Sequence, residues 1–334
     1  MEAQRANLST AQIAGNIANP KILAEMEDAK ELESVLLWNT EWNEPNRFNC
    51  DALHIADGGD WMPECTGVTF LNEELIAGAH HASGRIAIFN IHCSTHPILK
   101  IDCPFAMDDI ASKRISEREY EIVVSGNWEA HYATYRLTLD KMSGQPSMKL
   151  MAICRAPVFM NKNVPKTFSH SVLFIEGSIC VCLHTGHSPR IDINHGEKII
   201  RVPNGLYPTA ACWHEKDRKL FIGTNHQVPD KEGFQGSGCS IWKADLAKED
   251  FELVTELQSS HIDSMVLAGH KLWFNNQYQD AIMTTYIDGR SCPVRRLRHK
   301  SIGFPHGIDI YENRLLAVSN YKPSGISIFD ISAL

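Results

Sequence analysis

The sequence lacks several features that define large classes of protein. It has no run of eighteen apolar residues, and residues 1–29 carry Glu, Gln, Arg and Asn where a signal peptide needs an apolar core. The formal charge of -8 over 334 residues leaves no basic excess for binding nucleic acid. We therefore expect a cytoplasmic protein with no membrane or nucleic-acid partner, in an oligomeric state that the sequence leaves open.

Cys-x-x-Cys pairs and nucleophile motifs are also missing. The ten cysteines include no Cys-x-x-Cys pair, and no Ser, Cys or Thr lies in a recognisable elbow or triad context. Cys65 and Glu64 are better interpreted as a buried thiol and a solvated carboxylate than as a nucleophile and a base. Buried, reduced thiols are expected for the cysteines within apolar strand patterns, which are Cys154, Cys180, Cys182 and Cys212.

What the sequence contains is a repeated pattern of short apolar strands and tight turns. The end of the chain shows it most clearly, with strands expected at 307–311, 314–319 and 325–331. Six copies occur at intervals of roughly forty to sixty residues, which is typical of four-stranded propeller blades. Their first strands are expected to start at Thr66, Met107, His170, Thr209, Asp263 and His306.

The last copy runs out of chain after three strands, and the missing strand is available at residues 34–40. Pairing it with the final blade closes the ring and leaves no exposed sheet edge. The sequence therefore predicts an all-β, six-bladed β-propeller in a single domain, residues 34–334. Residues 1–33 are expected to form an extension with a short helix, which Asn19 can cap and Pro20 can begin. Whether residues 1–19 are ordered is left open.

In a propeller, the start of each inner strand and the end of each second strand meet on one face, where a ligand would bind. Imidazole, amide and aromatic side chains around such a mouth are typical of a small-molecule site. Packing between blades is the alternative role for each ring. The expected substrate-binding residues are His80, His184, Asn225, Gln277, Asn320, Tyr321, Trp128 and Tyr278.

The sharpest group on this face is His170, Asp263 and His306. A carboxylate beside an imidazole raises the histidine pKa and fixes its tautomer, as a general acid or base needs. We predict these three as catalytic residues: His306 as acid or base, Asp263 as its orienting partner, and His170 as a second proton donor or oxyanion stabiliser. The alternative is that the polar side chains only keep a wet channel hydrated.

No metal or other cofactor is predicted. The alternative is a divalent metal bound by imidazoles of the same rim. Calcium is disfavoured because the aligned inner strands offer only Asp263 as a carboxylate ligand. The rim imidazoles are His80, His81, His184, His187 and His226.

At Pro305-His306-Gly307-Ile308 the chain resembles six-bladed propellers of the regucalcin, gluconolactonase, paraoxonase and strictosidine synthase group. That group often has Pro-Asn-Gly-Leu here, with the Asn a ligand in calcium-dependent members. His306 takes that place, and the literal Pro203-Asn204-Gly205-Leu206 is out of register, because Thr209 aligns instead. The resemblance implies the fold and argues against a calcium lactonase mechanism. Members without the calcium set resemble strictosidine synthase, with acid/base groups at the channel mouth.

Together these patterns predict an enzyme without a redox cofactor that acts on a small, partly apolar, natural-product-like molecule. Cyclisation, isomerisation or elimination by His/Asp acid-base catalysis would fit the residues. One alternative is a metal-assisted hydrolase, a lactonase or esterase. The other is a non-catalytic propeller that binds proteins, which would show an exposed apolar or strongly charged patch.

Overall fold

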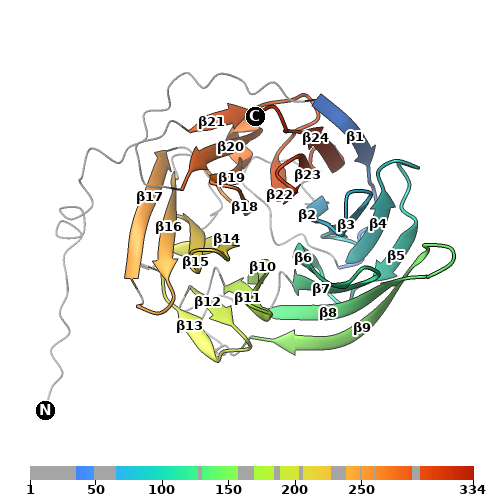
Figure 1. Cartoon of the computed structure of the whole chain (residues 1–334), viewed down its shortest axis with the longest axis horizontal. Helices are drawn as coiled ribbons and strands as arrows, with labels where there is room; N and C mark the ends of the chain where they lie inside the picture. The colour runs from blue at the N-terminus through green and yellow to red at the C-terminus, as the bar shows by residue number, and fades with distance from the viewer. Residues whose placement is uncertain are drawn as a thin grey trace, which may run out of the picture.

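The computed structural model describes residues 35–48, 65–126, 130–156, 169–183, 189–202, 206–226, 238–248, 250–258, 260–287 and 294–334. Within these residues, six four-stranded antiparallel sheets surround a central axis (Figure 1). The predicted six-bladed, all-β propeller is therefore confirmed. The expected N-terminal helix falls outside the described residues. No helix in the described part of the chain is long and apolar enough to cross a membrane.

Each blade is a meander that runs outwards from the axis. Blade 1 comprises β2 (Cys65–Phe70), β3 (Leu75–His80), β4 (Arg85–Asn90) and β5 (Leu99–Asp102). Blade 2 comprises β6 (Met107–Ser116), β7 (Glu119–Gly126), β8 (His131–Leu139) and β9 (Pro146–Arg155). Blade 3 comprises β10 (Ser169–Ile175), β11 (Ser178–Leu183), β12 (Arg190–Ile193) and β13 (Lys198–Ile200).

The second half of the ring repeats this order. Blade 4 comprises β14 (Tyr207–His214), β15 (Lys219–Asn225), β16 (Gly238–Asp245) and β17 (Asp250–Gln258). Blade 5 comprises β18 (Met265–Ala268), β19 (Lys271–Asn276), β20 (Ala281–Tyr286) and β21 (Arg295–Leu297), with a short 3-10 helix, η3 (Gln277–Gln279), before β20. Blade 6 comprises β22 (Pro305–Tyr311), β23 (Leu315–Tyr321) and β24 (Ser324–Asp330), completed by β1 (Val35–Glu41).

The ring is closed by its two ends, as the sequence predicts. Strand β1 pairs antiparallel with β24, from Val35 opposite Asp330 to Glu41 opposite Gly325. In Figure 1 the first described strand, blue, lies beside the last strands, red. Closure gives the last blade its outermost strand, so the edge of β24 is paired rather than exposed.

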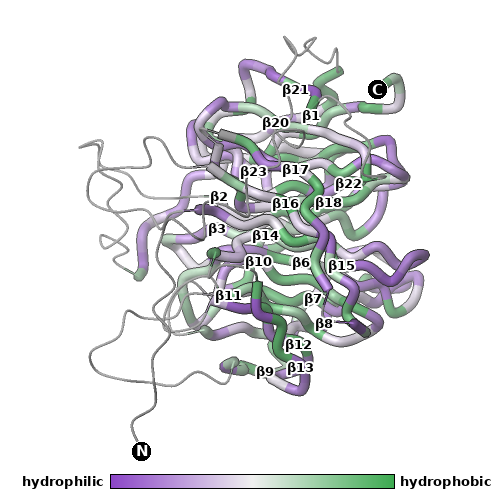
Figure 2. The backbone as a smooth tube through the Cα atoms, turned by 90° about the vertical axis from the view of Figure 1, so that its left-hand side faces the viewer, coloured by the Kyte–Doolittle hydropathy of each residue, from purple (hydrophilic) through white to green (hydrophobic). Residues whose placement is uncertain are grey.

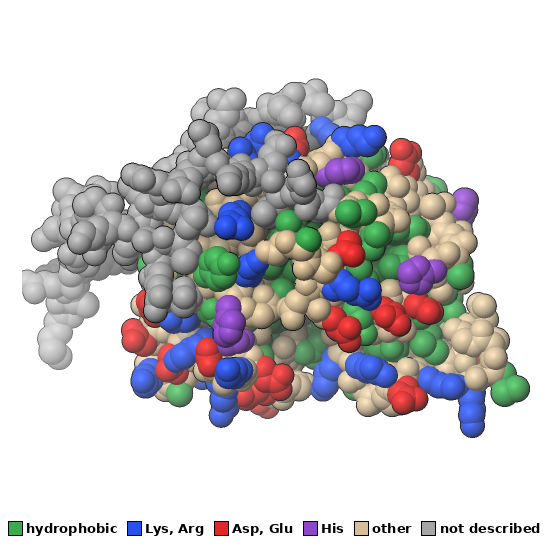
Figure 3. Space-filling view, turned by 45° about the horizontal axis from the view of Figure 1, so that its top comes forward, with side chains coloured by type: hydrophobic (Ala, Val, Ile, Leu, Met, Phe, Trp, Pro, Cys, Tyr) green, Lys and Arg blue, Asp and Glu red, His purple; other side chains and the backbone are tan. Residues whose placement is uncertain are grey.

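The core lies between neighbouring blades, because each strand directs alternate side chains to opposite faces of its sheet. Ile86 and Ile88 of blade 1 pack with Ile122 and Tyr135 of blade 2, and all four are fully buried. Viewed from the side, hydrophobic stretches run through strands in the middle of the ring, while many hairpins are hydrophilic (Figure 2). On the face in Figure 3, described Lys and Arg side chains are interspersed with Asp and Glu.

Five of the six inner strands share an irregularity near their first residues. The pairing with the second strand shifts register there in β2, β6, β10, β14 and β22. Such bulges bend a strand and re-aim a side chain. The irregular positions include Thr66, Asp108, His170, Thr209 and His306.

In blade 5 a side chain, rather than a shift of register, holds the backbone just before the inner strand. Its inner strand β18 starts at Met265, later than the predicted start at Asp263. The side-chain oxygen Oδ1 of Asn275 accepts hydrogen bonds from the backbone N–H groups of Asp263 (2.9 Å) and Ser264 (2.8 Å). A side chain thus satisfies these donors in place of a strand partner.

Candidate functional site

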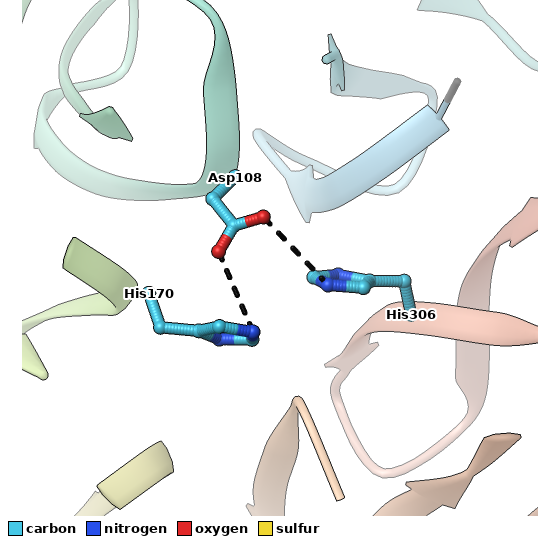
Figure 4. Close-up of side chains that lie close together, drawn as sticks. All are labelled: Asp108, His170 and His306. Atoms are coloured by element: carbon cyan, nitrogen blue, oxygen red, sulfur yellow. Dashed lines mark ion pairs between the residues drawn. The ribbon is translucent and has the colours of Figure 1, made fainter. Parts of the chain in front are cut away.

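Three of the bulged inner strands bring Asp108, His170 and His306 together near the axis (Figure 4). Nε2 of His170 lies 3.4 Å from Oδ2 of Asp108, and Nε2 of His306 lies 3.8 Å from Oδ1 of the same carboxylate. The two imidazole rings stack, with centroids 5.2 Å apart. All three side chains are buried, although they come from blades 2, 3 and 6.

Blade 5 adds a second carboxylate to this cluster. Oδ1 of Asp263 lies 3.2 Å from Nε2 of His170 and 3.0 Å from Nε2 of His261. Its Oδ2 lies 4.0 Å from Nε2 of His306. The structure therefore brings together His170, Asp263 and His306, the three residues that the sequence predicts as catalytic. Their catalytic role remains a prediction.

Backbone carbonyls fix the orientation of two rings in the cluster. Nδ1 of His306 donates a hydrogen bond to the carbonyl oxygen of Thr66 at 2.7 Å. Nδ1 of His81 likewise donates to the carbonyl oxygen of Met107 at 2.6 Å, and it lies 4.0 Å from Asp108 Oδ1. A carbonyl oxygen only accepts, so Nδ1 carries the hydrogen and Nε2 of neutral His306 presents its lone pair towards the carboxylates.

Asn225 holds the segment that carries His261 and Asp263. Its Oδ1 accepts from the backbone N–H of Ile262 at 3.0 Å, and its Nδ2 donates to the carbonyl oxygen of Ile262 at 2.9 Å. The same Nδ2 lies 3.3 Å from Nε2 of His261. Asn225, predicted to bind substrate, is thus engaged in positioning the neighbouring blade.

The buried charges shift the pKa values of the cluster in opposite directions. Burial would lower the pKa of His170, but the nearby carboxylates, Asp108 first, outweigh it and raise this pKa to about 9. Burial lowers the pKa of His306, because it outweighs the attraction of Asp263 and Asp108. Burial alone would raise the pKa of Asp263, but the neighbouring imidazoles, chiefly His261, hold it well below its usual range. The two stacked imidazoles therefore differ in proton affinity.

An aromatic stack continues the cluster along blade 6. The Tyr321 ring stacks on His306 with centroids 5.0 Å apart, and Phe304 stacks on Tyr321 at 5.5 Å. Burial, together with the charges of Asp108 and Asp263, raises the pKa of the Tyr321 phenol well above its ordinary value. Apolar ring faces thus lie directly beside the charged groups, as in many small-molecule sites.

The other predicted substrate-binding residues lie in varied surroundings. Burial lowers the pKa of His80 to about 4, and its ring packs against Trp42 of the closing segment, 5.1 Å between centroids. Asn320 accepts from the N–H of Gly303 at 3.1 Å within blade 6.

Two further predicted residues lie close to His261. Gln277 donates its backbone N–H to the carbonyl oxygen of His261 at 3.2 Å, and the Tyr278 ring lies 5.6 Å from the His261 ring. His184 and Trp128 lie outside the described residues.

Sequence reasoning missed Asp108 and His261 as members of the cluster, and it named His81 only as a rim imidazole. The hairpin alignment placed Met107 where the bulge places Asp108, so the expectation that Asp263 is the only carboxylate of the inner strands is wrong. The acidic pair Asp108-Asp109 at the start of an inner strand was an available signal. His261 lies two residues before Asp263, a spacing that places both side chains on one face of an extended chain.

Of the imidazoles proposed as rim metal ligands, the three that the structure describes, His80, His81 and His226, do not form one group. His226 Nε2 is 2.6 Å from Ser240 Oγ in blade 4, and His80 is held by Ser83 Oγ at 3.0 Å. His184 and His187 lie outside the described residues. Among the described residues, Asp108, His170 and His306 are the set that can hold a metal ion, because one ligand atom from each lies within 4.8 Å of the others.

A cavity of about 270 Å³ lies further along the inner strands. Its lining includes Asp109, Ser171 and Ser264, each the residue immediately after a member of the cluster. The cavity therefore lies next to the cluster, further along the inner strands.

Comparison with known proteins supports the fold. No protein-family model and no curated protein sequence matches the chain. The structure is similar to virginiamycin B lyase from Staphylococcus aureus, with a TM-score of 0.52 and 13% identity over 90% of this chain and 100% of that chain. It is also similar to a glucose dehydrogenase (TM-score 0.55, 9% identity, 89% of this chain and 99% of that chain). A chain of a nidogen–laminin complex is a further neighbour (TM-score 0.53, 10% identity, 82% of this chain and 96% of that chain). At these identities the likeness shows the propeller fold alone.

Proposed function

We propose that this propeller is an enzyme that acts on a small, partly apolar organic molecule beside the His–Asp cluster. The observation that carries the proposal is the convergence of two imidazoles and two carboxylates from four blades on one buried point. Burying so many titratable groups is costly, and perturbed groups gather at functional sites more often than elsewhere. The aromatic stack of Tyr321 and Phe304 offers an apolar surface for the substrate.

The chemistry we propose is proton transfer with stabilisation of the charge that develops. His306, Asp263 and His170 are the groups that contact the reacting atoms. Cyclisation, isomerisation and elimination each begin by moving a proton and need no redox cofactor. One neighbour supports this class of reaction: a variant of virginiamycin B lyase with one histidine replaced by alanine, structurally similar at a TM-score of 0.50, is described as catalytically inactive.

The proposal is tested by hydrogen exchange with solvent. A panel of small aryl-substituted ketones, lactones and cyclic peptide esters, including quinupristin, is incubated with the protein in D₂O. We expect at least one compound to gain deuterium or change structure, and His306→Ala to reduce that rate at least about 100-fold with little change in melting temperature. His92→Ala, which removes an exposed imidazole, serves as the control.

Three outcomes would contradict the proposal. Full activity in His306→Ala would remove the cluster from the mechanism. A large loss of stability in that variant would make His306 structural. A panel in which no compound exchanges would point to a binding propeller. A panel in which esters are only hydrolysed would point to a hydrolase.

A further inference from the structure

The contacts of Asp108 with the two stacked imidazoles are longer than direct charge-assisted hydrogen bonds. Such bonds between an imidazolium and a carboxylate measure about 2.7–2.9 Å. Nε2 of His170 lies 3.4 Å from Oδ2 of Asp108, and Nε2 of His306 lies 3.8 Å from Oδ1 of the same carboxylate. Around an ion with bonds of about 2.0–2.2 Å, neighbouring ligand atoms lie roughly 3–3.6 Å apart and opposite ones about 4.2 Å apart. One ligand atom from each of Asp108, His170 and His306 lies within 4.8 Å of the others, so the three side chains are close enough together to share an ion.

The His306 ring is oriented as a metal ligand would be. Metal-binding histidines usually donate their second ring N–H to a carbonyl or carboxylate, which fixes the tautomer and the ring plane. Nδ1 of His306 donates to the carbonyl oxygen of Thr66 at 2.7 Å, and stacking between His170 and Tyr321 restrains the ring on both sides. The lone pair on Nε2 therefore faces the Asp108 carboxylate, an arrangement that a cation between them stabilises.

From this geometry we propose that Asp108, His170 and His306 bind a divalent transition-metal ion, such as Zn²⁺, Mn²⁺ or Fe²⁺. Two imidazoles and a carboxylate suit these ions, whereas calcium and magnesium prefer oxygen ligands alone. The ion also offsets the charges of two buried carboxylates, Asp108 and Asp263. This inference rests on the proposed function, because it names the electrophile of the same site.

With a metal at these three residues, His170 and His306 act as ligands and no longer transfer a proton themselves. The ion acts as a Lewis acid on the substrate. Asp263, held by His261 at 3.0 Å, remains as the group that accepts a proton. The proton moves from a substrate carbon to the Asp263 carboxylate, and the electron pair of the broken C–H bond stays on the substrate, where the ion stabilises it. His261 is then a positioning residue that acts through Asp263.

The test measures metal binding directly, without a substrate. Tag-free protein is stripped with a chelator, dialysed, and titrated calorimetrically with Zn²⁺, Co²⁺ and Ca²⁺, and its metal content is measured by elemental analysis. We expect one Zn²⁺ or Co²⁺ per chain, visible absorption from bound Co²⁺, and weaker binding of Ca²⁺. Asp108→Asn, His170→Ala and His306→Ala should each weaken binding at least about 100-fold, since each removes one of three ligands.

Matched variants separate this site from adventitious surface binding. His92→Ala and His96→Ala remove exposed imidazoles and should leave the affinity unchanged. Asp263→Asn should also retain the ion, because Asp263 is not one of the three ligands. Thermal melts of the metal-free variants show whether each one is folded. Equal binding by wild type and by His170→Ala/His306→Ala, or a preference for Ca²⁺, would overturn the inference.

The two proposals fail in different ways. In one case exchange activity is lost in His306→Ala, but stripped protein takes up no ion and keeps its activity. The proposed metal site is then wrong, and the proposed enzyme is supported. If one Zn²⁺ binds through the three ligands but no panel compound reacts, the proposed proton-transfer enzyme is wrong and the proposed metal site is supported.

Discussion

Asp108 and Asp109 are neighbours in one bulge, yet they lie in opposite environments. Asp108 faces His170 and His306 near the axis. Asp109 accepts hydrogen bonds from the backbone N–H of Val172 in the next blade at 3.1 Å and of Ile110 at 2.8 Å. Burial raises the pKa of Asp109 to about 7. The Asp108 carboxylate contacts imidazoles, and the Asp109 carboxylate joins two blades.

Asp309 repeats the second arrangement at the junction of blades 6 and 1. Its Oδ2 accepts from the backbone N–H of Phe70 at 2.7 Å and from the Thr69 hydroxyl at 3.0 Å, while Oδ1 accepts from the N–H of Ile310 at 2.8 Å. The inner strands therefore carry two layers of acidic residues: a layer that faces histidines and a layer that joins blades. We expect substitutions in the first to change activity and metal binding, and in the second to change stability.

The largest expected effect on stability comes from Asp109→Ala. It leaves the buried N–H groups of Val172 and Ile110 without their acceptor, at a cost of roughly 1–3 kcal/mol for each. We expect the free energy of unfolding in urea to fall by about 4 kcal/mol. Asp108→Asn, its matched partner, keeps an acceptor and lowers the excess of buried negative charge, but it removes the attraction that raises the pKa of His170, so we expect a smaller loss of about 2 kcal/mol. Equal losses in the two variants would abolish the distinction between the layers.

The pH dependence of stability gives a second, slightly smaller effect at Asp309. Burial outweighs the three donors and raises the pKa of Asp309 to about 6 from 3.8. A raised carboxyl pKa means that the folded state holds the proton more tightly, so this stabilisation is complete below pH 3.8 and lost as the pH rises through about 6. At about 1.4 kcal/mol per pKa unit the loss is up to about 3 kcal/mol.

The measurement compares wild type with Asp309→Asn by urea unfolding between pH 4 and pH 7. As the pH rises, the free energy of unfolding of the wild type should fall relative to that of Asp309→Asn. A difference independent of pH would mean that Asp309 keeps an ordinary pKa in the folded protein.

The fold was predictable from the sequence because it depends on repeated local signals. Each hairpin combines apolar strands with turn residues, and the six copies reinforce one another. The incomplete last copy and the spare strand at residues 34–40 also predicted how the ring closes, and β1 is found at Val35–Glu41. No single blade had to be read correctly for this result.

The site was only partly predictable, because a bulge adds a residue that a count along the hairpin cannot detect. Counting from the turn placed Met107 on the axis, whereas the register shift between Met107 and Ile110 presents Asp108 there. His170 and His306 were found because the same count happens to place them within their bulges. Contacts between blades, such as Asp263 with His261 and His170, depend on the curvature of the ring, which sequence spacing does not give.

A smaller effect is expected from Gly307→Ala, which tests how closely the bulge in blade 6 packs against blade 1. An added Cβ would lie 2.7 Å from the carbonyl oxygen of Thr66 and 2.8 Å from Ser319 Oγ. That carbonyl also orients His306. We expect a loss of about 2 kcal/mol in the free energy of unfolding, together with weaker Zn²⁺ binding, because the acceptor of the His306 Nδ1–H must move. Normal metal affinity in this variant would mean that Thr66 does not orient the ligand.

The smallest expected effect concerns Glu44, a carboxylate in a third setting at the closing strand. Its Oε1 lies 2.6 Å from Nζ of Lys100 and accepts from Trp42 Nε1 at 3.0 Å. The lysine side chain is 42% exposed, so solvent and salt screen the pair. Glu44→Gln keeps an acceptor for Trp42 and removes only the charge, so we expect a loss of about 1 kcal/mol at low salt that shrinks in 0.5 M NaCl. A loss as large as that of Asp109→Ala, or one unaffected by salt, would show that closure of the ring depends on this charge rather than on the pairing of β1 with β24.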